Sequence, residues 1–278
     1  MGRAAPPCDV MSEPGASSIT DLCIVTAVDV EFKIAASLLS GKSFSEDPPR
    51  VRLQRMKICR GLFSGRRVTI LQSGMGAVGF AEGLAKHLTN NRYDALIVSG
   101  LAGGLDQRLR VGDAVLYNFC YDARVSDFTR RERPGQGEVT ATGCDETLSG
   151  FLCRALTNSG LSFIQAPGIT VGRVVTEAKE KLALGARYGA AAVDMETYET
   201  LEACTRLGLP AAALRVISDE AVRDIPDFNR IYNADGRMNG WRTFAAMAAR
   251  PSAALRLLMT FRPALQSLKA TLQAAMGA

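Results

Sequence analysis

From residue 22 onward, short apolar runs alternate with segments in which apolar residues recur at helical spacing. Apolar runs of this kind predict buried strands, and the helical spacing predicts helices packed against them. The predicted strands are Leu22–Val28, Val68–Ser73, Ala95–Ser99, Asp113–Asn118, Ile169–Val175 and Ala211–Ile217. The predicted helices are Glu31–Leu39, Gly76–Leu88, Glu146–Asn158, Lys179–Tyr188 and Met195–Leu207. This alternation favours a single α/β domain, with a central twisted sheet that is mixed but largely parallel and is flanked by helices.

Two segments depart from this alternation. Residues 1–20 are rich in Pro, Ser, Gly and Ala and lack apolar periodicity, so we predict a disordered leader. Residues 236–278 form a helical pattern with expected breaks near Pro251 and Pro263. We therefore expect one folded domain over residues 21–235 and a basic helical C-terminal extension packed on it. The apolar positions of the extension are Trp241, Phe244, Met247, Leu255, Leu258, Phe261, Leu265, Leu268 and Leu272.

The net charge of +5 comes from this extension. No acidic residue follows Asp235, whereas six basic residues do: Arg237, Arg242, Arg250, Arg256, Arg262 and Lys269. Without them the 33 basic residues fall to 27, against 28 acidic ones, so the domain itself is nearly neutral. We therefore expect no nucleic-acid partner. The extension has two interpretations, a helix packed on the sheet or a basic amphipathic segment in peripheral contact with anionic lipid.

Residue types restrict the kinds of site that the chain can form. Seven scattered cysteines without a C-x-x-C spacing and a single histidine, His87, disfavour a zinc site, a disulfide framework and a serine triad. No apolar run reaches the length of a membrane span, and the first residues lack the apolar stretch of a secretory signal. We expect a cytoplasmic protein that uses no metal and no cofactor.

Carboxylates and glycines follow the predicted strands. In open α/β sheets ligands bind at the carboxyl ends of the strands, so these residues are the candidates for chemistry. Glu31 follows the first strand, a glycine-rich run from Gly100 follows the third, and Asp219 follows the last. Glu196 lies at the start of the predicted helix that precedes this last strand.

A second glycine pattern has a competing explanation. Gly74-x-Gly76-x-x-Gly79 follows a strand and opens a helix, as in the dinucleotide-binding fingerprint of NAD(P) enzymes. That fingerprint also requires an acid at the end of the next strand, where this chain has Ser99-Gly100, and the nearest acid beyond them is Asp106. A tight turn beside a ligand explains the glycines as well. An NAD(P)-binding oxidoreductase therefore stays as an alternative.

Five motifs, in order between residues 22 and 220, resemble those of the purine nucleoside phosphorylase and methylthioadenosine/S-adenosylhomocysteine nucleosidase superfamily. They are Ser73-Gly74-Met75-Gly76, Gly100-Leu101-Ala102-Gly103-Gly104, Val111-Gly112-Asp113, Asp194-Met195-Glu196 and Arg215-Val216-Ile217-Ser218-Asp219. The resemblance implies a nucleoside phosphorylase-like fold and cleavage of the N-glycosidic bond of a purine nucleoside.

The resemblance also implies roles for individual residues. Asp219 matches the general acid that protonates N7 of the leaving base, and must therefore hold a proton at neutral pH. Glu196 matches the residue that binds the ribose hydroxyls while positive charge develops on the sugar. The remaining substrate contacts would be Met195 against the sugar, Ser218 beside Asp219 or the base, Asp194, Gly100 and Leu101. The ordinary alternatives are a helix-dipole partner for Glu196 and a cap or turn former for Asp219.

The nucleophile separates hydrolases from phosphorylases in this superfamily. The first loop, Ala27-Val28-Asp29-Val30-Glu31, is similar to the nucleosidase pattern, in which the last glutamate activates water. The positions where phosphorylases carry a phosphate-binding Arg and a turn serine hold Val98 and Leu101. We therefore expect hydrolysis that releases adenine, with Glu31 as the base. A phosphorylase that uses Arg173 or an Arg of a partner subunit is the alternative.

Segments 100–106 and 192–196 also resemble a subgroup associated with hopanoid lipid biosynthesis, whose members are associated with removal of adenine from an adenosyl lipid. Such a substrate would give the basic extension a purpose. Methylthioadenosine and adenosylhomocysteine are the alternative substrates. The resemblance implies a homo-oligomer, with a dimer favoured, and a small-molecule purine nucleoside as partner. A non-catalytic nucleoside-binding protein is the remaining alternative, although all three carboxylates, Glu31, Glu196 and Asp219, are retained.

Overall fold

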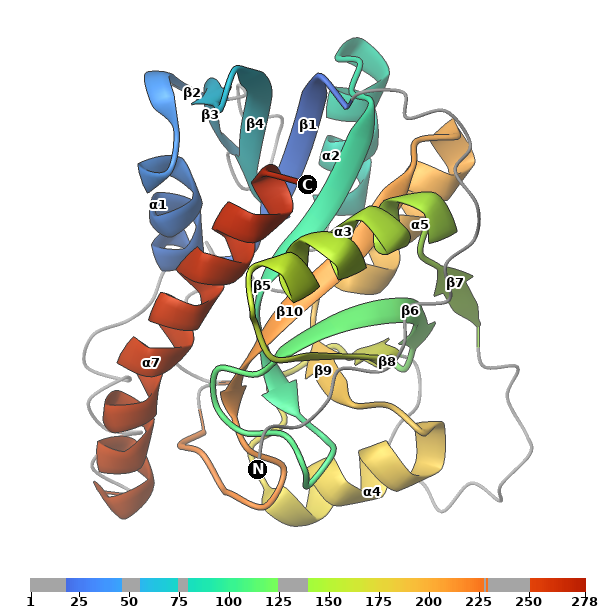
Figure 1. Ribbon diagram of the computed structural model, residues 1–278. Coiled ribbons are helices and arrows are strands. Elements are labelled where there is room, and N and C mark those ends of the chain that lie inside the picture. Colours follow the sequence, from blue (N-terminus) through green and yellow to red (C-terminus); the bar gives the residue numbers. More distant parts are fainter. Residues whose placement is uncertain (1–18, 47–55, 75–79, 125–139, 228, 230–250) are drawn as a thin grey trace.

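The computed structural model describes residues 19–46, 56–74, 80–124, 140–227, 229 and 251–278. Its strands are β1 (Asp21–Thr26), β2 (Ser40–Glu46), β3 (Lys57–Phe63), β4 (Arg66–Gln72), β5 (Ala95–Gly104), β6 (Ala114–Asp122), β7 (Ala141–Gly143), β8 (Phe163–Thr170), β9 (Ala192–Asp194) and β10 (Ala211–Asp219). Its helices are α1 (Asp29–Ser37), α2 (Phe80–Asn90), α3 (Glu146–Asn158), α4 (Ala178–Tyr188), α5 (Thr197–Leu207) and α7 (Pro251–Met276). The predicted α/β class, a mixed sheet flanked by helices in a single domain, is confirmed (Figure 1).

The strands follow the order β10-β6-β8-β9-β5-β1-β4-β3-β2. Strands β4, β1, β5 and β10 are parallel neighbours in that sequence, because β10 pairs with β5 as well as with β6. This second pairing closes β5, β9, β8, β6 and β10 into a small barrel. The carboxyl ends of β1, β5 and β10 therefore meet on one side of the sheet, which is where α/β sheets bind ligands.

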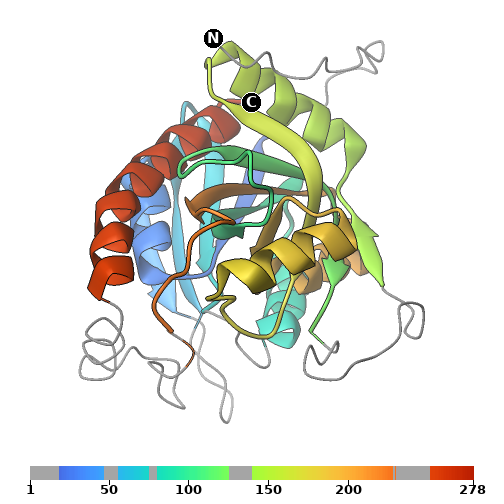
Figure 2. The ribbon, with the colours of Figure 1, turned by 90° about the horizontal axis from the view of Figure 1, so that it is seen from below.

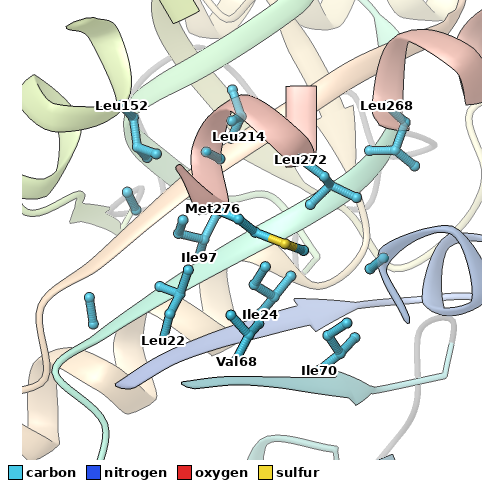
Figure 3. Close-up of a cluster of buried hydrophobic side chains, with 14 of the residues drawn as sticks. Leu22, Ile24, Val68, Ile70, Ile97, Leu152, Leu214, Leu268, Leu272 and Met276 are labelled. Carbon is cyan, nitrogen blue, oxygen red and sulfur yellow. The ribbon is translucent and has the colours of Figure 1, made fainter. Parts of the chain in front are cut away.

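The alternation of side chains along the strands produces two cores. Leu22 and Ile24 of β1 point into a cluster with α1, α3 and α7, which includes Leu272 and Met276 of α7 (Figure 3). Cys23 and Val25 point to the other face, in a cluster with α2 and α5. Because successive residues of a strand face opposite sides, the continuous apolar run of β1 is what a sheet covered on both faces requires.

The structure corrects three details of the predicted elements. The hairpin β2–β3 was not predicted, because every residue of β2 is exposed, its one large apolar side chain, Phe44, included, so the strand shows no burial pattern. The glycine-rich run from Gly100 is the end of β5, where it pairs with β9 and β10, rather than a turn after a strand. Helix α7 continues through Pro263 without a break, and residues that follow the proline are buried against the domain, among them Ala264, Leu268 and Leu272.

Helix α7 contacts β10, α1 and α3 and lies along one side of the molecule (Figure 2). Its C-terminal half is buried at Leu268 and Leu272, as expected for a helix packed on the domain. Its N-terminal half carries two exposed apolar side chains, Leu255 at 62% and Met259 at 70% exposure. Trp241, Phe244 and Met247 lie outside the described residues, as does the predicted leader up to residue 18. Among the described residues, no helix is long and apolar enough to cross a membrane.

Candidate active site

The Glu31 carboxylate lies at the carboxyl end of β1, in the first turn of α1. The helix begins there because Val28 is extended and Glu31, three residues later, folds back onto the Val28 N–H at 3.1 Å. The same oxygen, Oε2, accepts the Ala27 N–H at 2.9 Å, and Oε1 accepts the Leu101 N–H at 2.8 Å. Leu101 thus meets Glu31 through its backbone, and Gly100 packs directly against the carboxylate.

Burial dominates the electrostatics of Glu31. The side chain is buried, and burial raises the pKa of its carboxyl above the ordinary value of 4.5. The Leu101 N–H and the positive charge of Arg215 act in the opposite direction without reversing the shift. A carboxylate with a raised pKa is a stronger base when ionised, which is what activation of water requires. Three backbone bonds also fill three of its roughly four acceptor positions, so Oε1 keeps one position beyond the bond from Leu101.

Arg215, in the middle of β10, was predicted only as a member of its motif, although it is one of the largest fully buried side chains. Its Nε and Nη2 donate to Thr197 Oγ1 at 3.1 and 2.8 Å, and its Nη2 lies 3.8 Å from Glu196 Oε2. Burial disfavours the charged form of the guanidinium, but the attraction of Asp194 and Glu196 outweighs it and raises the pKa of Arg215. The sequence signal that marks this residue is a lone Arg inside an apolar strand.

Asp194 is an internal hub rather than a side chain open to the site. Its oxygens accept the Tyr117 hydroxyl at 3.1 Å, the Thr170 hydroxyl at 2.9 Å and both the N–H and the hydroxyl of Thr197 at 2.9 and 2.6 Å. Asp194 Oδ2 also lies 3.5 Å from Arg215 Nε. These bonds fix the start of α5 and the orientation of Arg215. Because they occupy the oxygens of Asp194, they disfavour a contact between Asp194 and substrate, which stays a prediction.

Glu196 is the N-cap of α5, and the helix begins at Thr197, two residues later than predicted. Its N–H donates to Asp194 Oδ1 at 3.1 Å, and its side chain is buried beside Arg215. Met195, between them, is half-buried. The Asp194 hub thus holds Met195 and Glu196 on a short fixed segment between β9 and α5.

The Asp219 carboxylate ends β10 and is oriented by an irregularity in the strand. The register of β10 against β5 shifts between Ile217 and Asp219, so that Asp219 pairs with Gly103. Such a bulge redirects the side chains that follow it. Ser218, at the bulge, donates its hydroxyl to Asp219 Oδ1 at 2.7 Å.

Lys181 of α4 forms a buried ion pair with Asp219 Oδ2, and the sequence analysis assigned it no role. Its Nζ also donates to the backbone oxygens of Arg223 at 2.9 Å and of Glu220 at 3.3 Å. No motif marks Lys181 in the sequence, since a single lysine at a helix start is usually exposed.

Strand β5 brings the carboxylates together. Its Leu101 N–H holds Glu31 and its Gly103 pairs with Asp219, at positions about 7 Å apart along the strand. Arg215, on the neighbouring strand, interacts with Glu196 and with Glu31. Glu31 and Asp219 therefore lie beside nearby positions of β5, and Arg215 connects Glu31 to Glu196. Met75 and Gly76, of the turn motif that begins at Ser73, lie outside the described residues. The described residues contain no group of three or more His, Cys, Asp or Glu that could hold a metal ion.

Residues 21–253 match the phosphorylase superfamily. The chain belongs to this family. Among solved structures of similar fold is the 5′-methylthioadenosine/S-adenosylhomocysteine nucleosidase of Neisseria meningitidis in complex with methylthio-immucillin-A. The match has 19% identity and a TM-score of 0.69, and covers 93% of this chain and 99% of that one.

Two further solved structures of similar fold come from other organisms. The Colwellia psychrerythraea nucleosidase of the same type, in complex with adenine, matches with 19% identity and a TM-score of 0.65 over 93% of this chain and 96% of that one. The futalosine hydrolase of Helicobacter pylori matches with 18% identity and a TM-score of 0.61 over 88% of this chain and 99% of that one. The family match and the shared fold support a glycosyl-bond-cleaving enzyme.

Proposed function

We propose that this phosphorylase-superfamily chain hydrolyses the N-glycosidic bond of an adenine nucleoside and releases adenine. The observation that carries the proposal is the buried Glu31 carboxylate, held by backbone N–H groups at the carboxyl end of β1 and facing the charge of Arg215. In this proposal Glu31 removes a proton from the attacking water. Asp219 protonates N7 of the base, and Glu196 binds the ribose hydroxyls.

Water fits this site better than phosphate does. A phosphate dianion in the place of the attacking water would meet the negative charge of Glu31, and bound phosphate requires cations instead. Arg215 is already engaged by Thr197 and lies close to two carboxylates. Arg173, the cation of the phosphorylase alternative, is paired with Glu180 and half-exposed. These contacts support hydrolysis.

Chemistry at both ends of the scissile bond supports the assignment of the acid and the base. Departure of adenine needs a proton on N7, and in this proposal the carboxyl group of Asp219, at the end of β10, supplies it. Positive charge builds on the ribose as the bond breaks, and Glu196 is an anion close to that region. The Glu196–Arg215 contact holds this anion in one orientation. The superfamily's nucleosidases named above act on 5′-thio-substituted adenosines, which makes methylthioadenosine and adenosylhomocysteine the first substrates to test.

The decisive experiment incubates the protein with methylthioadenosine, adenosylhomocysteine, adenosine and inosine, each in phosphate-free buffer and in added phosphate. We expect adenine and a free sugar at the same rate in both buffers. A rate that depends on phosphate, with a sugar 1-phosphate as product, would show a phosphorylase. Release of hypoxanthine in preference to adenine would overturn the assignment of the base.

A further inference from the structure

The ammonium group of Lys181 is fully buried and saturated with acceptors. Its side chain has no solvent exposure, and its three N–H groups meet Asp219 Oδ2 and the backbone oxygens of Glu220 and Arg223. Burial of an ammonium group carries a large desolvation cost. A salt bridge that served stability alone could be replaced by apolar packing, so its placement on the proposed acid needs a chemical explanation.

Two segments hold Lys181 in this position. The Ala178 N–H at the start of α4 donates to Asp224 Oδ1 at 2.8 Å, and the Ile225 N–H donates to Thr176 O at 2.9 Å. The Val174 N–H donates to Asn229 Oδ1 at 2.8 Å. The segment that follows β10 is thereby docked on the segment that precedes α4. Lys181 and Asp219 are held on opposite sides of this contact.

The hydrogen bonds of Asp219 conflict with its role as a simple acid. Oδ2 accepts from Lys181 and Oδ1 accepts from Ser218. A carboxylate in an ion pair with the ammonium group of a lysine is ionised, and an ionised carboxylate has no proton to give to a base. The proton of the pair therefore resides on the Lys181 nitrogen.

We propose that Lys181 stores the proton that Asp219 delivers to the leaving base. An N–H bond of Lys181 breaks as an O–H bond forms on Asp219, which turns two buried charges into two neutral groups. The O–H bond then breaks as an N–H bond forms on N7 of the base, while N9 keeps the electron pair of the glycosidic bond. The pair regains one proton from solvent after the base has left. Lys181 acts through Asp219 and is a positioning residue; the inference rests on the proposed function.

The test compares two leaving groups. Purine nucleosides need a protonated base, whereas 4-nitrophenyl β-D-ribofuranoside releases a nitrophenolate that needs no proton. For Lys181→Met we expect kcat/KM on the best adenine nucleoside to fall by about 10²-fold, the lower end of general acid catalysis, and to change by less than about threefold on the nitrophenyl riboside. Lys179→Met, on the same helix but exposed, is the matched control and should leave both rates unchanged.

A second variant covers the event that Lys181→Met does not fold. Lys181→Gln keeps a donor for the Arg223 and Glu220 oxygens but has no proton to transfer, so the same selective loss is expected. Because Lys181 and Asp219 act on one proton, Lys181→Gln should add little to the loss caused by Asp219→Asn. Equal losses on both substrates would show a structural role and overturn the proposal.

The outcomes also separate this inference from the proposed function. If Asp219→Asn loses activity only on the purine nucleoside while both Lys181 variants keep it, Lys181 stores no catalytic proton and the proposed function stands. If the wild-type protein releases no base from any purine nucleoside, the proposed function fails and the role of Lys181 fails with it.

Discussion

Gly100 and Glu31 are packed so closely that no side chain fits between them. A Cβ atom at position 100 would lie 2.8 Å from both carboxylate oxygens of Glu31. The Gly100 φ of +154° lies outside the range that side-chain-bearing residues prefer. The glycine therefore defines the space that the Glu31 carboxylate occupies.

Gly100→Ala is expected to displace this carboxylate from the Leu101 N–H and to lower kcat at least about tenfold, with an overpacking cost of about 1–3 kcal/mol in the free energy of unfolding. Steady-state kinetics and denaturant titration measure the two effects. Gly143→Ala, at a strand glycine with no atom within 4 Å of the new Cβ, is the control. Unchanged kcat in Gly100→Ala would remove Glu31 from the mechanism.

Glu31→Gln tests the water-activating base. The carboxamide cannot remove a proton from water, and its NH₂ group opposes one of the backbone N–H groups that now bind the carboxylate. We expect kcat to fall by about 10²–10⁴-fold and stability to fall as well, because part of the α1 cap is lost. Single-turnover kinetics show whether the bond-breaking step is slowed. A variant with more than half of wild-type kcat contradicts the role.

The raised pKa of Glu31 has a consequence for stability. The folded state binds this proton more tightly than the unfolded state, so the stabilisation by the protonated form is present below pH 4.5 and is lost as the pH rises through the higher pKa of the folded state. The difference in the free energy of unfolding between wild type and Glu31→Gln should therefore fall over that window and stay constant above it. Urea titrations at a series of pH values, starting below pH 4.5 and continuing upward until the difference is constant, measure it. A difference that rises with pH contradicts the shift.

Asp219→Asn tests the acid. We expect a loss of about 10²–10⁴-fold on adenine nucleosides with the fold retained, because the amide keeps the size of the carboxyl but cannot pass a proton to N7. Asp106→Asn, at an acid paired with Arg108 on the surface, is the matched control. Base release is followed by chromatography and the fold by circular dichroism. Turnover above half of the wild-type value would exclude Asp219 as the acid.

The exposed part of α7 is expected to bind anionic vesicles if the substrate is an adenosyl lipid. Leu255 and Met259 are exposed, Arg262 and Lys269 are basic and exposed, and each basic residue near such a surface contributes about 1 kcal/mol. Sedimentation with phosphatidylserine vesicles should show binding that fades with salt and is weakened in Leu255→Ser/Met259→Ser. Leu207→Ser, at an exposed apolar residue of α5, is the control. No binding at low salt would leave only the interpretation of a packed helix.

The sequence predicted the helices that bury one apolar face and the central strands that are buried on both faces. Helix α3 has the predicted bounds, Glu146–Asn158, because it begins at an Asp cap and buries one apolar face. Hairpin β2–β3 escaped prediction because β2 lies at the edge of the sheet with exposed side chains. Pro263 was expected to break the last helix, but packing of Ala264 and Leu268 on the sheet outweighs the cost of the proline.

For the candidate site, the sequence predicted the carboxylates that follow the strands, but not the groups that bind these carboxylates. Glu31, Glu196 and Asp219 were found by their place at strand ends and by their motifs. The groups that bind the Glu31 carboxylate are backbone N–H groups, and every residue except proline has one, so the sequence does not reveal them. Lys181 reaches Asp219 from a helix 38 positions earlier, a contact that depends on how α4 docks. A buried charge partner of this kind is set by tertiary packing rather than by local pattern.

The apolar cluster that joins Leu22 of β1 to Met276 of α7 has a consequence for synthesis of the protein (Figure 3). Helices α1 and α3 cover only part of this face of the central strands, and the rest stays uncovered until α7 supplies Leu268, Leu272 and Met276. Exposed strands of this kind are prone to aggregation during that interval. Burial of Leu22 and Ile24 in β1 therefore depends on α7, and folding is completed only after α7 has been synthesised.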